Sequence, residues 1–147
     1  MNSVYNKVLE FKKKYPHSIT WQRLKKHSEV VEKHLNPGEF VTYAFPGQKN
    51  DSVMDVFSTS VVVLTNKRIL IGQKRLLYGY FLTSITPDLF NDLEVYQGLL
   101  FGKITIDTVK EVVVITNLDK KALPEIETAI TSFMMEEKKK YPLRDSE

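Results

Sequence analysis

The stretch that decides the fold reads VVVLTNKRILI and spans residues 61–71. Its first half is β-branched or aliphatic, which is typical of a buried strand. The polar group Thr65-Asn66-Lys67-Arg68 then interrupts the apolar run, and Thr and Asn side chains can satisfy the backbone of a tight turn. Because a second apolar run, Ile69-Leu70-Ile71, follows, the stretch predicts a β-hairpin. We expect Lys67 and Arg68 to have a structural role, keeping the turn and the start of the second strand solvated.

Apolar and β-branched segments continue on both sides of this hairpin and are separated by turn residues. They predict seven strands, over residues 39–45, 56–65, 67–73, 76–82, 89–96, 99–108 and 111–117. Residues 46–52 are expected to form a loop, because Pro46 and Gly47 favour turns. Short connections favour an antiparallel meander over βαβ units, so the expected fold class is mainly β with α.

Two helices are predicted before the first strand, because apolar residues there recur every three or four positions. The first helix presents Val4, Val8 and Phe11, and it should stop at Tyr15-Pro16 since a proline disfavours helical geometry in the residue before it. The apolar face of the second helix consists of Trp21, Leu24, Ser28, Val31 and Leu35.

Ser18 or Thr20 can cap the second helix, and Asn36-Pro37-Gly38 is expected to end it. The two helices together form a helical hairpin whose apolar stripe must be covered. We expect the stripe to pack on the following domain, with a partner chain as the alternative.

A last helix is predicted near the C-terminus, because apolar residues again recur at helical spacing. Its stripe consists of Ile126, Ala129, Ile130, Phe133 and Met134. Pro124 is tolerated only because it falls in the first turn. The expected organisation is a helical hairpin over residues 1–37, a domain over residues 38–140 and a tail over residues 141–147.

Composition restricts the function. The chain has 147 residues, 42% of them hydrophobic and 27% charged, which suits one globular domain. The absence of cysteine excludes disulfides, thiolate metal sites and cysteine nucleophiles. No signal-peptide or membrane-spanning pattern is present, so we expect a cytoplasmic protein. All three histidines lie in the helical hairpin, and no nucleophile–base arrangement can be argued, so we expect no enzyme, no cofactor and no metal.

Seven antiparallel strands followed by one amphipathic helix is the order of elements in the pleckstrin-homology (PH) superfold. The residues resemble those of bacterial PH-like domains of the YokE-like kind in three places: Asn36-Pro37-Gly38-Glu39, residues 63–69 and residues 98–106. The resemblance covers about residues 36–137. It implies a partly open, strongly bent sheet plugged at one end by the helix. It also implies a binding or assembly module without an assigned ligand, since a fold alone does not give a function.

Protein association, with another protein or with a second copy, is the function that we predict. A PH-like sheet has exposed edges, and a groove between its fifth strand and its last helix can accept an added strand or peptide. We expect Leu89, Leu93 and Val95 at this groove, which a second copy of the chain could occupy, as the related domains suggest. The other candidate contact surface is the hairpin stripe with Trp21, Leu24 and Val31.

The alternative is peripheral docking on an anionic membrane surface. The net charge is +3, but residues 1–37 hold eight basic and three acidic side chains and so carry +5. The candidate residues are Lys12, Lys13, Lys14, Arg23, Lys25 and Lys26. An inositol-phosphate cradle is not expected, because the loop at residues 46–52 offers only Lys49 with Asp51 close by. Nucleic-acid binding is not expected either, because the sheet is close to neutral. These basic side chains can also simply be the solvated faces of two helices.

Overall fold

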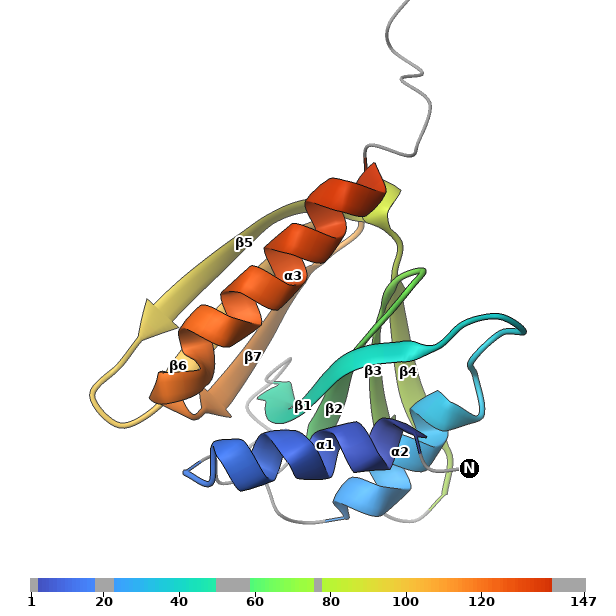
Figure 1. The fold of residues 1–147 in the computed structure, drawn as a ribbon, viewed down its shortest axis with the longest axis horizontal. Coiled ribbons are helices and arrows are strands. Elements are labelled where there is room, and N and C mark those ends of the chain that lie inside the picture. The colour runs from blue at the N-terminus through green and yellow to red at the C-terminus, as the bar shows by residue number, and fades with distance from the viewer. Residues whose placement is uncertain (1–2, 18–22, 50–58, 76–77, 139–147) are drawn as a thin grey trace, which may run out of the picture.

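A seven-stranded sheet runs through the molecule in the order β4-β3-β2-β1-β7-β6-β5 (Figure 1). The computed structural model describes residues 3–17, 23–49, 59–75 and 78–138. The strands are β1 (Val41–Lys49), β2 (Ser60–Thr65), β3 (Ile69–Lys74), β4 (Tyr80–Ile85), β5 (Phe90–Gln97), β6 (Gly102–Thr108) and β7 (Val112–Leu118). Neighbouring strands are antiparallel, which confirms the predicted meander, and β4 and β5 lie at the two edges.

Helices cover both faces of this sheet. The α-helices are α1 (Ser3–Lys14), α2 (Leu24–Glu32) and α3 (Leu123–Lys138), and the short 3-10 helices are η2 (Pro87–Leu89) and η3 (Lys120–Ala122). In Figure 1, α3 crosses the β5–β7 half of the sheet, while α1 and α2 lie against the β1–β4 half. The helices predicted at both ends are thus confirmed. None of the described helices combines the length and the apolar character that crossing a bilayer requires.

The start of α2 differs from the predicted one. The N-cap position is occupied by Arg23, which has a positive φ of 59° and makes no capping hydrogen bond with its side chain. Its guanidinium donates instead to the carbonyls of Lys74 and Arg75, at 3.3 and 3.2 Å, and so fastens the helix to the end of β3. The predicted caps, Ser18 and Thr20, lie outside the described residues.

β2 is buried on both faces, which explains its continuous run of valines. Val62 and Leu64 belong to the main core, together with residues of α3 such as Ile130. Val61 and Val63 belong to a second cluster, which contains residues of α1 and α2. The helical hairpin therefore packs on the sheet of its own chain, as expected.

β1 continues through Pro46 to Lys49, so the prediction of a loop from residue 46 is wrong for this part. The reason is tertiary pairing, because Pro46 lies opposite Val61 of β2 and Lys49 lies opposite Ile115 of β7. Gly47 permits the close approach, since a Cβ at that position would collide with the side chain of Ile115. One long strand thus joins the two halves of the sheet.

β4 begins at Tyr80 rather than at residue 76. The N–H of Arg75 donates to the carbonyl of Gly79 at 3.0 Å, and Gly79 has a positive φ of 84°, a conformation that favours glycine. Tyr78 and Gly79, which were predicted as strand, therefore lie before β4. Residues 56–58 and 76–77, which were also predicted as strand, lie outside the described residues.

β6 likewise begins at Gly102 rather than at residue 99. The N–H of Gly98 donates to the carbonyl of Phe101 at 2.9 Å and closes the turn between β5 and β6. Leu99 and Leu100 therefore lie in this turn and not in a strand.

Candidate functional site

A buried carboxylate joins two of the motifs on which the family resemblance rests. The side chain of Glu39 has no exposed surface, and Arg68 donates to both of its oxygens, from Nε at 2.9 Å and from Nη2 at 3.1 Å. The hydroxyl of Thr65 and the N–H of Asn36 donate to it as well, at 2.6 and 3.0 Å. Burial by itself would raise the pKa of Glu39, but these hydrogen bonds, those of Arg68 foremost, outweigh burial and hold the pKa below its usual value. These motif residues therefore stabilise the fold.

Arg68 has the structural role that was expected, but its side chain is largely buried in an ion pair with Glu39 and does not serve as a solvated cation. Its guanidinium also donates to the carbonyl of His34, just after α2, and to the hydroxyl of Ser84 on β4, both at 3.0 Å. Lys67 is exposed, as expected. The Glu39–Arg68 pair thus fastens the end of the helical hairpin to both β1 and β4.

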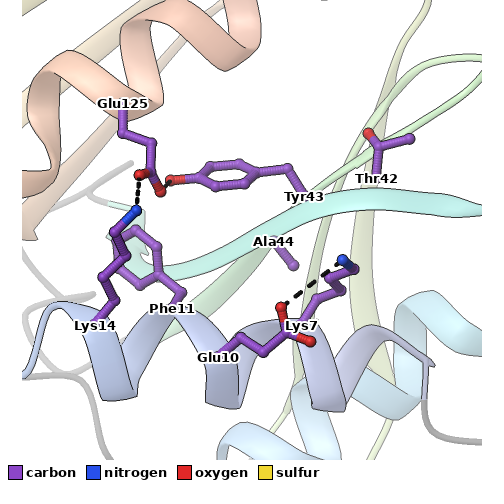
Figure 2. A pocket seen from close by; sticks show the side chains of 8 residues that line it. All are labelled: Lys7, Glu10, Phe11, Lys14, Thr42, Tyr43, Ala44 and Glu125. Carbon is purple, nitrogen blue, oxygen red and sulfur yellow. Dashed lines mark hydrogen bonds and ion pairs between the residues drawn. The ribbon is translucent and has the colours of Figure 1, made fainter.

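A second carboxylate, that of Glu125, lies with its hydrogen-bond donors at a pocket of about 160 Å³ between α1, β1 and α3 (Figure 2). Glu125 accepts at one oxygen from Lys14 Nζ, at 2.5 Å, and from the Tyr15 hydroxyl, at 3.0 Å. Its other oxygen accepts from the Tyr43 hydroxyl at 2.9 Å. Burial, reinforced by Glu125, raises the pKa of Tyr43 far above its usual value, so Tyr43 remains a donor.

The hydrogen bonds in this pocket have a structural role. Burial by itself would raise the pKa of Glu125, but the hydrogen bonds from Lys14 and the two tyrosines hold the pKa below its usual value. An ionised carboxylate that already receives three donors offers neither a poised base nor a nucleophile. The cluster therefore ties α1 to α3 across β1.

A more basic pocket, of about 370 Å³, lies between α2, β3 and β4. It is lined by Lys26, Glu29, Val30, Lys33, His34, Lys74 and Tyr80. Three lysines against one glutamate give this pocket an attraction for anions. Among the described residues, no group of three or more His, Asp or Glu side chains is placed to hold a metal ion.

Two of the three residues predicted for partner binding on the hairpin face inward. Leu24 and Val31 are 6% and 0% exposed, because α2 presses them against β2 and β3. A partner therefore has no access to them in this fold. Trp21, the third member of that set, lies outside the described residues.

The residues predicted at the fifth strand lie together near α3. Leu93 and Val95 are half-buried on β5 and pack against the main core. Leu89 is half-buried at the end of η2, directly before β5. α3 packs along β5 and η2, so it covers much of the expected groove, and β5 is an edge strand of the sheet that the structure describes.

The six basic residues predicted for an anionic surface do not form one patch. Lys12 is only 4% exposed, and burial lowers its pKa, with Asp119 acting in the opposite direction. Lys14 is paired with Glu125, and Arg23 is engaged at the end of β3, as described above. The exposed members of the set are Lys13, Lys25, Lys26 and the ion-paired Lys14.

Sequence reasoning missed two exposed apolar features. Tyr80 and Phe81 protrude from the β4 edge, and Leu99 and Leu100 protrude from the turn between β5 and β6. The glycines that bracket the leucine pair were a usable signal, because a Gly-bounded dipeptide is typical of a turn. Nothing in the local pattern of β4 shows that it is an edge strand, since that depends on the strand order.

Comparison with known proteins identifies relatives of this fold. The model of a protein family described as Bacterial PH domain matches residues 35–132. The pleckstrin homology domain from Shewanella amazonensis SB2B is similar, with 15% identity and a TM-score of 0.54 over 76% of this chain and 96% of that one. No curated protein matches the chain.

Two further solved structures are similar. The C-terminal domain of an unknown protein from Leishmania infantum has 15% identity and a TM-score of 0.52, over 86% of this chain and 95% of that one. A DUF1696 family protein with a pleckstrin-homology domain from Shewanella loihica PV-4 has 13% identity and a TM-score of 0.51, over 78% of this chain and 99% of that one. At such identities the likeness shows the fold alone.

Proposed function

Because the chain belongs to the bacterial PH domain family, we propose that it is a non-catalytic binding module that associates with a second copy of itself along β4. PH-like domains commonly bind proteins or lipids and are generally non-catalytic. The observation that carries the proposal is the contrast between the two edges of the sheet.

Among the residues that the structure describes, no strand pairs with the outer edge of β4, and β4 itself has none of the charged residues that usually protect an edge strand. Natural sheets place charged residues on their edges or cover them, which prevents pairing with another chain. β4 contains no charged residue, and its Tyr80 and Phe81 are 51% and 55% exposed. β5, by contrast, carries the exposed acids Asp92 and Glu94, and α3 packs along it.

A second copy suits the β4 edge better than the β5 edge. Two antiparallel β4 strands related by a twofold axis would form an interface in which the same residues meet. Aromatic pairs across such strands are favourable, whereas like charges directly opposite are unfavourable. Pairing of two β5 strands would bring Asp92 and Glu94 of both copies together.

Sedimentation velocity of the full chain tests this proposal. The wild type should show a concentration-dependent dimer, and Phe81→Lys should be monomeric because it places a charge on each strand of the pair. The matched control is Tyr96→Lys, a similarly exposed aromatic residue on β5, which should remain dimeric.

Two outcomes would contradict the proposal. The first is a wild type that is monomeric at every concentration. The second is a dimer that Tyr96→Lys disrupts and Phe81→Lys does not, which would favour the β5 surface of Leu89, Leu93 and Val95.

Docking of the helical hairpin on an anionic membrane is the second candidate function. It is supported by the exposure of Lys13, Lys25 and Lys26, and by the basic pocket that Lys26 shares with Lys33 and Lys74. We name the triple substitution Lys13→Gln, Lys25→Gln and Lys26→Gln the hairpin variant. If the hairpin is the docking surface, this variant should lose salt-sensitive binding to anionic vesicles, and unchanged binding would exclude the hairpin.

A further inference from the structure

The turn between β5 and β6, residues 97–101, exposes an apolar pair. Leu99 and Leu100 are 87% and 72% exposed, and Tyr96, just before the turn, is also mostly exposed. In Figure 1 this turn forms the left end of the molecule, on the side opposite to β4. We call residues 97–101 the β5–β6 tip. Contiguous exposed apolar side chains on a protein surface mark an interaction site.

Two lysines contact the base of the β5–β6 tip. Lys120 Nζ donates to the carbonyl oxygen of Leu99 at 2.8 Å. Lys103 Nζ lies 5.3 Å from the centroid of the Tyr96 ring, at a cation–π distance. The tip is therefore held in place by side chains that carry positive charge.

The exposed charges within residues 96–103 and 118–122 have one sign, and the exposed acids of β5, Asp92 and Glu94, lie farther from the tip along the strand. Lys103 and Lys121 are exposed, and Lys120 is half-buried. Asp119 lies between β7 and η3, is 3% exposed, and accepts hydrogen bonds from the backbone N–H groups of His17 and Lys121. The solvent-facing charges of residues 96–103 and 118–122 are thus positive, and they surround the exposed side chains of Leu99 and Leu100.

We propose that the β5–β6 tip docks on an anionic lipid bilayer, an activity that goes beyond association along β4 and does not depend on it. The side chains of Leu99 and Leu100 enter the boundary between headgroups and acyl chains. Tyr96 and Phe101 lie at the headgroup level, where aromatic rings are favoured. Lys103, Lys120 and Lys121 face the lipid phosphates. Such binding combines buried apolar area with electrostatic attraction.

The shape of the surface favours a lipid over a protein. The tip projects beyond the ends of β5 and β6 (Figure 1), and a protein partner would need a matching hollow to bury it. A bilayer adapts to a convex apolar point without a preformed pocket. Charge complementarity supports the same choice, because lysines near an anionic leaflet each strengthen binding by about fivefold.

Co-sedimentation of the full chain with vesicles tests the proposal. The vesicles are phosphatidylcholine alone, or phosphatidylcholine mixed with phosphatidylglycerol, at low and at moderate salt. The wild type should pellet with the anionic vesicles. Leu99→Ser with Leu100→Ser should weaken binding by at least about tenfold at both salt concentrations. Gln at Lys103, Lys120 and Lys121 should weaken it by about a hundredfold at low salt and less at moderate salt.

Two matched controls separate the tip from other surfaces. Val109→Ser with Val112→Ser removes exposed apolar side chains from the β6–β7 end and should bind like the wild type. The hairpin variant should also bind like the wild type. Urea unfolding of every variant checks that its fold is retained.

Three results would overturn the proposal. The first is no pelleting of the wild type with anionic vesicles at low salt. The second is loss of binding in the hairpin variant with full binding in the leucine variant. The third is a change of mass in solution on replacing the leucines, with no vesicle binding by the wild type, which would indicate a protein contact. Phe81→Lys leaves the tip intact, so failure of the dimer and failure of lipid docking are separate results.

Discussion

β2 and β6 belong to one sheet, yet their side chains are buried differently. Every residue of β2 is buried, whereas β6 alternates between buried residues such as Ile104 and more exposed ones such as Lys103. The cause is the helical hairpin, which covers the outer face of the β1–β4 half and has no counterpart over β5–β7 among the described residues (Figure 1). The difference teaches that α1 and α2, which lie outside the family match at residues 35–132, complete the second core cluster against β2.

The two halves also end in different edges. β5 carries acids and has α3 packed along it, while β4 has no charged residue of its own and exposes aromatic rings, with Arg75 Cζ 5.2 Å from the centroid of the Phe81 ring. The hairpin thus stabilises the half of the sheet whose edge we propose for association. Substitutions in the β1–β4 half and in the β5–β7 half can therefore be compared by their effects on the stability of the fold.

Removal of the hairpin should have the largest effect. A chain that begins at residue 35 keeps the family-matched part but uncovers Val61, Val63 and Leu70, which are buried against α1 and α2. Exposure of several core side chains exceeds the marginal stability of a small domain. We expect the truncated chain to lose its cooperative thermal transition, measured by circular dichroism.

A pair of substitutions in α1 supplies the control for the truncation. Val8 is fully buried and Leu9 is 43% exposed, although they are adjacent. Val8→Asp should behave like the truncation, because it buries an unpaired charge, and Leu9→Asp should leave the transition nearly unchanged. A truncated chain that melts cooperatively at the wild-type temperature would refute the role given to the hairpin.

Loss of the arginine in the Glu39–Arg68 pair should have the next largest effect. Arg68→Leu leaves a fully buried carboxylate without its cation, so we expect the free energy of unfolding to fall by about 3–5 kcal/mol. The neighbouring Lys67 is exposed, and Lys67→Leu should change stability by less than about 0.5 kcal/mol. Equal losses of unfolding free energy in the two variants, measured by urea unfolding, would mean that the Glu39–Arg68 pair does not stabilise the fold.

His27 should give the β1–β4 half a pH dependence above the carboxyl range. Burial, with a smaller contribution from Arg23, lowers the pKa of His27 to about 4, and its Nδ1 accepts the N–H of Lys74 at 2.7 Å. Between about pH 6.5 and pH 4 the unfolded chain therefore binds a proton that the folded chain does not. Stability should fall by roughly 2–4 kcal/mol as the pH falls through this window.

Urea unfolding at pH 7 and pH 4.5 measures this dependence. His27→Gln should flatten it, whereas His17→Gln, at an exposed histidine, should not. The carboxyl pKa values of Glu39 and Glu125 are lowered, so their contribution is present above the unfolded value and is lost only as the pH falls below about 4.5. A wild type whose stability does not change between pH 7 and pH 4.5 would rule out the neutral, buried state of His27.

The smallest expected effects come from two glycines that bring a helix close to each half. A Cβ on Gly72 would lie 2.5 Å from Val31 Cγ2 of α2, and a Cβ on Gly102 would lie 2.6 Å from Leu123 Cδ1 of α3. Valine is held in one rotamer in a helix, while leucine can change both χ1 and χ2 and so move the three atoms that would clash, Cγ, Cδ1 and Cδ2. Gly72→Ala should therefore cost about 2 kcal/mol and Gly102→Ala about 1 kcal/mol. Equal losses on urea unfolding would mean that both halves accommodate a methyl group alike.

Much of the fold could be predicted because each element has its own periodicity. Val61 to Leu64 indicated a buried strand, and the stripe through Ile126 and Ile130 indicated the last helix. The bounds were less predictable, since Pro46 and Gly47 favour a turn locally but pair with β2 and β7 in the fold. Pairing between distant segments overrode turn propensity there.

The candidate surfaces were less predictable than the fold, for a related reason. Lys12 counted as an exposed cation by charge, although it follows Val8 by four residues and so shares the buried face of α1. Leu24 and Val31 were correctly placed on one helix face, but the sequence left open whether this chain or another covers it. The leucines of the β5–β6 tip looked like strand residues because apolar composition alone does not report exposure.

The sequence by itself determined the seven strands, the helices at both ends and the tight turn at Thr65-Asn66, because these depend on side-chain spacing and on local hydrogen bonding. Only the tertiary structure decided that the hairpin covers β2, that Arg68 reaches Glu39, and that β4 is an edge strand of the described sheet. Those features depend on which distant segments meet. A one-dimensional pattern specifies the face that a side chain takes, and the packing of the whole chain specifies what lies against that face.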